Sequence, residues 1–400
     1  MSYVKEICTK QLLDSILKNY LKKSLKVSNV HIQQVSEPGD NFSSEIQRLT
    51  VSYDVDKDEP NKIISIIVKC ILDDEQIAAF DRDTKLSEKE HSIYREILPH
   101  MVTLGVKEQF SPTSYYMTLL PRSVIFLEDL CSLGYEMVSR DQGLDLQHCI
   151  FSIEKLARFH ASSVLLFHQN PKLLNKFNNA LYYKNPHFDV LSLSTYEDMK
   201  AVCGKVQDLQ MYHNKMQKIV NLDQRICQAL APSSEFNVLN HGDFWTTNIM
   251  FRYTPNRKIE DAMFFDYPLS YFGSPALDLH YFIVTSTDLE VKMKHIDTLL
   301  DHYFDQLLLS LRELNVNNVP TRKELYADFV KRAYIGLTSI FFSLPLTTSP
   351  KRNDADLGNY FKEEDIERTD SYRYKCFNSE RYINDLKHLL PYYDALGIFN

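Results

Sequence analysis

Glycine is scarce in this chain, and its scarcity excludes two common ways of binding a nucleotide. Only 10 of the 400 residues are glycine, which is about a third of the usual share of roughly 7 %. Neither the G-x-G-x-x-G dinucleotide fingerprint nor the G-x-x-x-x-G-K-[ST] phosphate loop occurs in the sequence. Any phosphate chemistry is therefore performed without a glycine-built cradle.

Three further absences narrow the class of protein. The net charge of −8, from 45 Lys and Arg against 53 Asp and Glu, is not that of a nucleic-acid binder with a broad basic surface. The seven scattered cysteines form no C-x-x-C pair, so zinc ribbons are disfavoured and a reducing compartment is indicated. The most apolar stretch, residues 63–72, is too short to span a bilayer. We expect a cytoplasmic protein with no membrane span and no nucleic-acid partner.

The first 130 residues predict a small antiparallel sheet with an inserted helix. Apolar residues at helical spacing predict helices, and β-branched alternation predicts strands. The helices are expected at 4–25 and at 82–100, where Pro99 should end the second, and the strands at 28–72 (three of them), 115–118 and 123–127.

The remaining sequence is mostly helical in pattern. Helices are expected at 145–168 and 288–313, β-like segments at 238–253 and 262–265, and a long surface loop at 345–372 before a final helix. The fold class is therefore α+β. We expect two lobes, an N-lobe of residues 1–130 with the antiparallel sheet plus a helix, and a larger, mostly α-helical C-lobe of residues 131–400.

The most informative motif is His241-Gly242-Asp243-Phe244-Trp245-Thr246-Thr247-Asn248. Its spacing, H-x-D-x-x-x-x-N, is that of a kinase catalytic loop, in which the aspartate accepts the proton of the attacking hydroxyl and the asparagine binds magnesium. Asp266 follows the apolar run 262–265, which predicts a buried strand. A carboxylate at the end of such a strand is well placed to bind magnesium that bridges a triphosphate. The motif therefore predicts ATP- and Mg²⁺-dependent phosphoryl transfer.

Upstream residues supply candidates for binding the phosphates. Lys69 ends the third predicted strand, from which an ammonium group can reach the α- and β-phosphates. A lysine on an apolar strand needs a partner, and Glu90 in the following helix can supply it, with Glu88 and Glu96 as open alternatives. The segment 39–44, which includes Asn41 and Ser43, can cover the phosphates with backbone N–H groups and hydroxyls, although alone it is only a hairpin turn.

Several motifs in the same order along the chain resemble the ecdysteroid kinase-like (CHK kinase-like) family. That family belongs with the choline kinases and aminoglycoside phosphotransferases in the protein-kinase-like superfamily. The resemblance rests on residues 124–130, 156–161, 238–253, 264–266 and 273–279. It implies a bilobal protein-kinase-like fold and an ATP- and Mg²⁺-dependent kinase. The acceptor implied is a hydroxyl of a small molecule, either an ecdysteroid-like steroid or a xenobiotic alcohol or phenol.

The resemblance also implies a role for each matched position. Asp243 is the expected catalytic base, Asn248 and Asp266 are the expected metal ligands, and Lys69 with Glu90 forms the phosphate-binding pair. Backbone groups of Glu128 and Leu130 are expected to meet the adenine edge, while His241 and Asp278 support the catalytic loop. Asp266 is followed by Tyr267-Pro268 rather than Phe-Gly, so control through an activation loop is not supported.

Other functions stay open from the residues alone. The main alternative is a non-catalytic pseudokinase that binds a nucleotide or small molecule, although the full set of Lys69, Asp243, Asn248 and Asp266 argues against it. A metal-dependent phosphoesterase would need more His and Asp ligands than the sequence groups near His241. A protein kinase would need a peptide-binding segment after Asp266, where a helix is expected instead.

Overall fold

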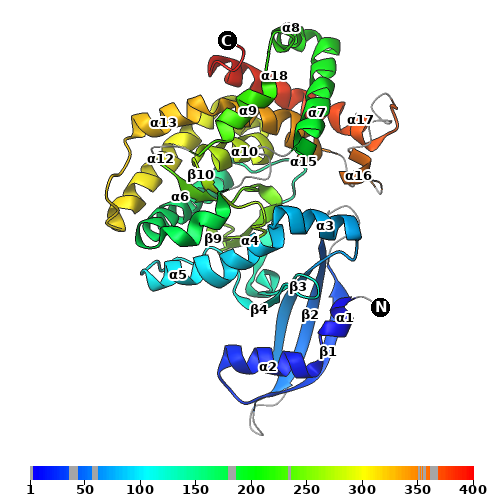
Figure 1. Cartoon of the computed structure of the whole chain (residues 1–400), viewed down its shortest axis with the longest axis vertical. Helices are drawn as coiled ribbons and strands as arrows, with labels where there is room; N and C mark the ends of the chain where they lie inside the picture. The colour runs from blue at the N-terminus through cyan, green and yellow to red at the C-terminus, as the bar shows by residue number, and fades with distance from the viewer. Residues whose placement is uncertain are drawn as a thin grey trace.

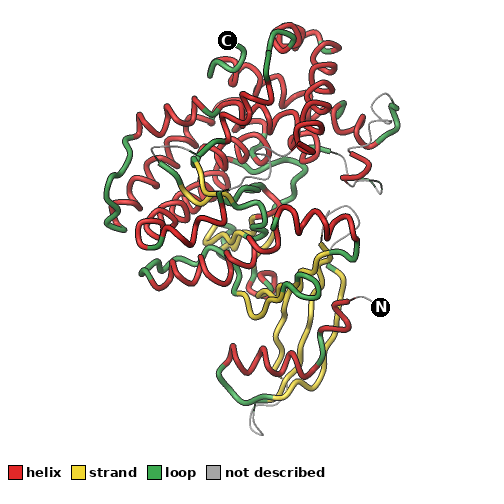
Figure 2. The backbone as a smooth tube through the Cα atoms, viewed as in Figure 1, coloured by secondary structure: helices red, strands yellow, loops and turns green. Residues whose placement is uncertain are grey.

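Alternating apolar residues build a sheet at the N-terminal end of the chain. The computed structural model describes residues 3–35, 44–55, 62–178, 186–232, 236–349, 352, 354, 357–360 and 368–400. The sheet is antiparallel throughout, with strand order β1-β2-β3-β5-β4 (Figures 1 and 2). Its strands are β1 Lys26–Gln34, β2 Ser44–Asp54, β3 Lys62–Ile71, β4 Ser114–Thr118 and β5 Val124–Glu128. All five predicted strands are confirmed.

The two faces of this sheet have different neighbours. Ile66, Val68 and Cys70 of β3 are fully buried in a hydrophobic cluster with the helix α2, Lys10–Leu21. Because side chains alternate along a strand, Lys69 lies on the opposite face, between Ile46 of β2 and Ile125 of β5 in the ladder. The strand pattern thus directs one lysine away from the apolar cluster.

The predicted helix at 4–25 is two helices, α1 Tyr3–Ile7 and α2 Lys10–Leu21. The break falls at Thr9, whose extended backbone and side chain cap α2 by accepting a hydrogen bond from the Leu12 N–H at 3.2 Å. A threonine that caps a helix start in this way stabilises it by about 1 kcal/mol, which explains why one periodic pattern gives two helices.

The predicted helix at 82–100 also differs from the structure at its end. The chain after β3 forms α3 Glu75–Thr84, α4 Leu86–Ser92, the π-helical turn η1 Ile93–Ile97 and α5 Leu98–Thr103. Pro99 was expected to end the helix, but the helix continues past it. Proline removes an N–H donor and clashes with the carbonyl four residues earlier, and the wider π-helical turn, closed by Leu98 N–H on Ile93 O, accommodates it.

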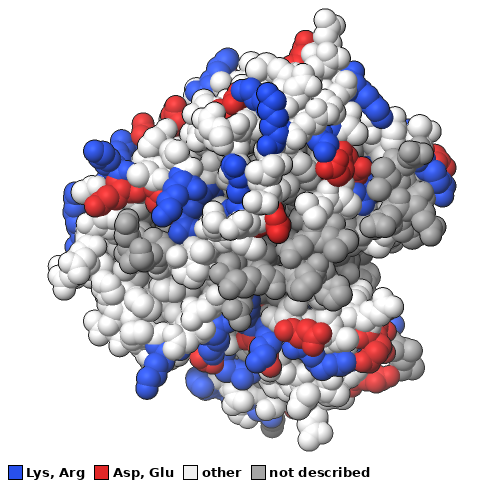
Figure 3. Space-filling model, turned by 45° about the horizontal axis from the view of Figure 1, so that its top comes forward, with Lys and Arg blue, Asp and Glu red and all other residues white. Residues whose placement is uncertain are grey.

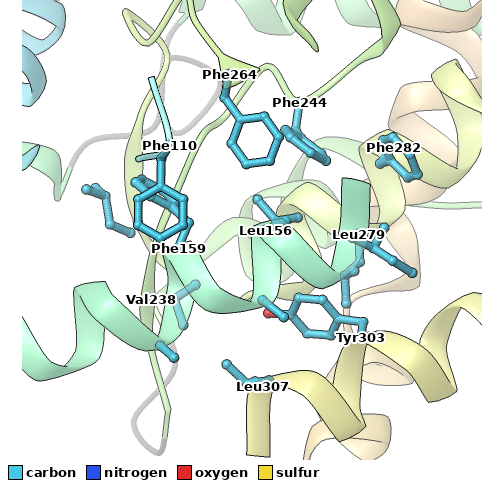
Figure 4. Close-up of a cluster of buried hydrophobic side chains, with 14 of the residues drawn as sticks. Phe110, Leu156, Phe159, Val238, Phe244, Phe264, Leu279, Phe282, Tyr303 and Leu307 are labelled. Carbon is cyan, nitrogen blue, oxygen red and sulfur yellow. The ribbon is translucent and has the colours of Figure 1, made fainter. Parts of the chain in front are cut away.

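The larger part of the molecule is built around α6. This helix, Leu146–Gln169, packs along α12, Ile296–Glu313 (Figure 1). Figure 4 shows Leu156 and Phe159 of α6 among Phe244, Phe264 and Tyr303. The same hydrophobic cluster includes Ile93, Tyr94 and Ile97 of η1, and Ile125 and Leu127 of β5. The helix segment α4–η1–α5 is therefore packed into the same hydrophobic core as α6.

The remaining elements complete this part. The other helices and strands before His241 are η2 Leu130–Leu133, β6 Tyr135–Met137, η3 Pro171–Phe177, α7 Pro186–Lys205, η4 Gln207–Leu209, α8 Gln210–Met216 and α9 Leu222–Leu230. Those from the motif onward are β7 Val238–Asn240, η5 Thr246–Asn248, β8 Ile249–Tyr253, β9 Ile259–Phe264, β10 Tyr271–Gly273, α10 Ala276–Ser286, α11 Leu289–Lys294, α12 Ile296–Glu313, α13 Arg322–Lys331, α14 Ala333–Thr338, η6 Ser339–Ser343, α15 Leu344–Thr347, α16 Leu357–Tyr360, α17 Tyr372–Phe377 and α18 Glu380–Ala395.

Three details in this region differ from the predictions. The expected helix at 288–313 is broken at His295, whose φ of −126° is not helical, into α11 and α12. The expected loop at 345–372 contains part of α15 and the short helix α16, although much of it lies outside the described residues. The strand β10, which pairs with β7, had no alternating pattern to predict it.

The predicted α+β class is confirmed, with an antiparallel sheet plus a helix in one part of the molecule and a larger, mostly helical part. The five-stranded antiparallel sheet lies at one end of the molecule with α1 and α2, and most of the other helices lie towards the opposite end (Figure 2). Basic and acidic side chains are interspersed on the face in Figure 3, and its outline is hollowed between the two ends. The described helices include none that is both long and apolar enough to cross a membrane. A lobe boundary at residue 130 stays a prediction.

Candidate active site

The motif of His241 to Asn248 forms the connection between β7 and β8. Its second residue, Gly242, has φ of +83°, a left-handed conformation that glycine adopts without steric cost. A Cβ atom at this position would lie 2.0 Å from the backbone oxygen of Leu269. The glycine is therefore required by both conformation and space, and it lets the motif turn tightly against the segment that follows Asp266.

Both carboxylate oxygens of Asp243 have hydrogen-bond donors. Tyr281 donates its hydroxyl to Oδ1 at 2.7 Å, and Asn248 Nδ2 donates to Oδ2 at 3.0 Å. Asn248 Nδ2 also reaches the backbone oxygen of Asp243 at 2.9 Å. Burial raises the pKa of Asp243 to about 6, against the lowering effect of the Tyr281 and Asn248 hydrogen bonds. Asp243 is thus an oriented carboxylate with a pKa close to neutrality, as a general base requires.

The helix α10 holds the backbone of the motif in place. The buried carboxylate of Asp278 accepts the N–H of His241 at 2.7 Å and the N–H of Gly242 at 2.9 Å. His160 Nε2 lies 3.1 Å from the same carboxylate, and the Tyr303 hydroxyl lies 2.6 Å from His160 Nδ1. Asp278 therefore joins the backbone of the motif to α10.

His241 serves as a hydrogen-bonding support of the loop. Its Nε2–H donates to the carbonyl of Phe265 at 3.0 Å, and its Nδ1 accepts the N–H of Asp243 at 3.4 Å. The ring also packs on Tyr267, with the ring centroids 4.5 Å apart. Burial lowers the pKa of His241, so the neutral imidazole joins the loop of residues 241–248 to the segment that carries Asp266.

Asp266 lies just beyond the end of β9 and faces Lys69. Its φ of +71° is in the left-handed region, which is rare for a residue with a side chain. Such strain is concentrated at functional sites. Asp266 Oδ1 lies 2.5 Å from Lys69 Nζ, and the N–H of the preceding Phe265 donates to Asn248 O at 3.2 Å. The backbones that carry Asp266 and Asn248 therefore lie next to each other.

Lys69 is paired with Glu90, one of the three glutamates considered. Its Nζ lies 2.8 Å from each Glu90 carboxylate oxygen, whereas Glu96 pairs with Lys176 and Glu88 is exposed. Burial by itself lowers the pKa of Lys69, but the negative charges of Asp266 and Glu90 outweigh it and raise the pKa overall. Lys69 is therefore a fully charged cation held between two carboxylates.

Asn248 and Asp266 offer a donor set that suits magnesium. Because both contacts to Asp243 use the amide nitrogen of Asn248, its side-chain oxygen is the atom left to face a metal. An amide oxygen and a carboxylate are hard ligands of the kind that Mg²⁺ prefers when phosphates and water supply the rest. The described residues contain no cluster of three or more His, Cys, Asp or Glu that could hold a metal by themselves.

The predicted hinge has a support that the sequence did not reveal. The N–H of Glu128 donates to Thr113 O at 2.8 Å, so its carbonyl is the backbone group left for a ligand. Between Glu128 and Leu130, the side chain of Asp129 is buried and accepts hydrogen bonds from Arg48 Nε and Ser65 Oγ, each at 2.6 Å. Asp129 thus fastens the hinge to β2 and β3.

Two predicted site residues are not described by the structure, and two residues at the site were not predicted. Asn41 and Ser43 lie outside the described residues. Tyr281 and Asp129 were not among the predicted site residues. The only sequence signal for Tyr281 is its spacing of three from Asp278, which places both side chains on one face of a helix. For Asp129, the only signal is its place between two expected hinge residues.

Comparison with known proteins identifies the family of this chain. Solved structures of a glucosamine kinase resemble it at 10 % identity and a TM-score of 0.36. One is crystal form A, covering 81 % of this chain and 89 % of that one, and another, in complex with glucosamine, ADP and inorganic phosphate, covers 81 % and 91 %. These likenesses are too low to inform the site, and no curated protein matches the chain. The model of the ecdysteroid kinase-like family matches residues 38–316, which include the motif of His241 to Asn248 and Tyr281, and the chain belongs to this family.

Proposed function

We propose that this protein is a kinase that uses ATP and Mg²⁺ to phosphorylate a hydroxyl group of a small molecule. The observation that supports this most strongly is a convergence at one site. Lys69 lies 2.8 Å from Glu90 and 2.5 Å from Asp266, and Asn248, a neighbour of Phe265, lies 3.0 Å from Asp243. Four separate segments of the chain thus meet at one site. They bring together a cation for the phosphates, two oxygen ligands for a metal, and a carboxylate that can act as a base.

In the proposed reaction, Asp243 accepts the proton of the acceptor hydroxyl. The hydroxyl oxygen forms a bond to the γ-phosphorus while the bond from that phosphorus to the β,γ-bridging oxygen breaks, which releases ADP. Lys69 offers its positive charge to the phosphate oxygens. Since its Nζ contacts both Glu90 and Asp266 in this structure, the arrival of the phosphates replaces the Asp266 contact and keeps the one to Glu90.

Asn248 and Asp266 are the residues that would hold magnesium. A metal held there would neutralise the negative charge that develops on the transferring phosphoryl group. The loss of the Lys69 contact leaves Asp266 Oδ1 available for that role. His241 and Asp278 keep the catalytic loop and the Asp266 segment together, so the base and the metal ligands keep a fixed separation.

The acceptor is proposed to be an ecdysteroid-like steroid or a xenobiotic alcohol or phenol, in keeping with the family. A peptide acceptor is disfavoured by the path of the chain. After Asp266 it passes through β10, Tyr271–Gly273, directly into α10, which starts at Ala276. This segment is too short to form the peptide-binding platform and activation loop of a protein kinase.

A cytoplasmic setting is proposed from the cysteines. All seven are free thiols, and Cys8, Cys70, Cys149, Cys203 and Cys376 are buried. Free buried thiols are ordinary in a reducing compartment, whereas secreted proteins commonly use their cysteines in disulfides.

Replacement of Asp243 by asparagine tests the proposed function. D243N keeps the shape of the side chain but cannot accept the proton, so phosphate transfer should fall by at least about 100-fold while Mg-ATP still binds. The assay is mass-spectrometric detection of phosphorylated products after incubation with Mg-ATP and a mixed library of steroids and phenols.

The control is D305N, because Asp305 is an exposed carboxylate that pairs with Arg322 on the surface. It should phosphorylate the same compounds as the unaltered protein. Full turnover by D243N would show that Asp243 is not the base. Binding of Mg-ATP by the unaltered protein with no product from any compound would favour the pseudokinase alternative.

A further inference from the structure

Tyr281 contacts the proposed base from the same helix that supports the catalytic loop. Its hydroxyl donates to Asp243 Oδ1 at 2.7 Å, while Asn248 takes Oδ2 at 3.0 Å. With a separate donor on each oxygen, the carboxylate is restrained from rotating about its bond to Cβ. Of the two donors, Asn248 belongs to the catalytic motif and Tyr281 does not.

The position of Tyr281 follows from the periodicity of α10. Asp278 and Tyr281 are three residues apart, so their side chains lie on one face of the helix. Asp278 holds the backbone N–H groups of His241 and Gly242, and Tyr281 holds the side chain of Asp243. The intervening His280 faces elsewhere and contacts Phe329 O and the Tyr393 hydroxyl. One polar face of α10 thus fixes both the backbone of the loop and its reactive carboxylate.

We propose that Tyr281 is a positioning residue, which holds Asp243 in the orientation that receives the acceptor proton. This inference rests on the proposed role of Asp243 as base. A hydrogen bond to a carboxylate is stronger than one between neutral groups, and a displacement of about 1 Å in a reacting group can slow a reaction by about 100-fold. The hydroxyl of Tyr281 therefore contributes to turnover and not to the binding of ATP.

The first test is Y281F, which removes a single oxygen atom. We expect kcat to fall by about 10- to 100-fold, with the KM for ATP and the thermal stabilisation by Mg-ATP unchanged. The matched control is Y135F, because Tyr135 also donates its hydroxyl to a carboxylate, Asp261 Oδ2 at 2.6 Å, which is not one of the proposed site residues. Y135F should keep the kcat of the unaltered protein.

The second test is a double-mutant cycle with D243N, measured in single turnovers for sensitivity. If Tyr281 acts through Asp243, Y281F should reduce the residual rate of D243N by less than about twofold. A purely structural hydroxyl would cause the same loss in both backgrounds, and that result would overturn the proposal. An unchanged kcat in Y281F beside an inactive D243N would also overturn it and leave the proposed function intact. Full activity of D243N would instead contradict the proposed function itself.

A third variant keeps the test decisive if Y281F does not fold. Replacement of Tyr281 by 4-aminophenylalanine preserves the ring and a donor, but the amine is a weaker donor than a phenol. We expect kcat to fall by about 2- to 10-fold with the KM for ATP unchanged. An unchanged kcat in this variant would overturn the proposal.

Discussion

Burial of Asp243 sets the pH at which the proposed base can act. Its pKa is raised to about 6, and a base accepts a proton only in its ionised form. We therefore expect kcat/KM to rise as the pH increases through about 6 and to reach a plateau above about 7. The measurement is a profile of kcat/KM from pH 5 to 8, since this parameter reports the ionisation of the free enzyme.

Circular dichroism at each pH is the control for unfolding. Activity that is constant from pH 5 to 8 would contradict either the role of Asp243 or the environment described for it. An ordinary aspartate, with a pKa of about 3.9, would give a profile that is flat over this range.

At the scale of single residues, the sequence indicated the groups proposed to react but not all of the groups that contact them. Lys69, Asp243, Asn248 and Asp266 were predicted because they stand at fixed distances in motifs with a chemical reason. Tyr281 resembled one more buried aromatic in an apolar helix, and its contact with Asp243 depends on how α10 lies against the loop. Such a contact between distant segments leaves no periodic signal in one sequence.

At the scale of elements, Asp129 joins the hinge to the sheet and is expected to stabilise both. D129A removes the acceptor used by Arg48, Ser65 and the Cys131 N–H and leaves those donors without it. We expect a loss of about 2–4 kcal/mol in the free energy of unfolding and a higher KM for ATP. The measurement is denaturant unfolding together with ATP-dependent kinetics.

The matched control for D129A is D73A. The Asp73 carboxylate is 91 % exposed and lies 3.5 Å from Arg122, so its loss should change stability by less than about 1 kcal/mol. Equal effects of the two substitutions would show that Asp129 has no special role in holding the hinge.

The elements themselves were mostly predicted, and their breaks were not. The strands β1 to β5 and the helix α6 follow hydrophobic periodicity, which a single sequence displays directly. The breaks at Thr9 and His295 and the continuation through Pro99 depend on local hydrogen bonds and backbone conformation. These features alter the chain over one or two residues and are hidden inside otherwise regular patterns.

At the scale of the whole molecule, Mg-ATP should stabilise the fold because its expected ligands come from both ends of the molecule. At a concentration of 100 times Kd, binding contributes about 2.7 kcal/mol, or roughly 3 °C in Tm for a chain of this length. Most of this shift should disappear when EDTA removes the metal, and also in D266N, while D305N keeps it. A shift that is equal with and without magnesium would contradict the proposed metal dependence.

Because the α4–η1–α5 segment packs in the core of the helical body, the Lys69–Glu90 pair links that body to the sheet. Glu90 stands on a helix whose continuation, at Ile93 and Tyr94, is buried with Phe159 in the core of the larger part. Lys69 stands on β3, whose other face packs against α2. A rotation of the sheet against the helical body therefore acts directly on the 2.8 Å contact between Lys69 and Glu90. The length of this one ion pair therefore reports how the sheet is oriented against the helical body.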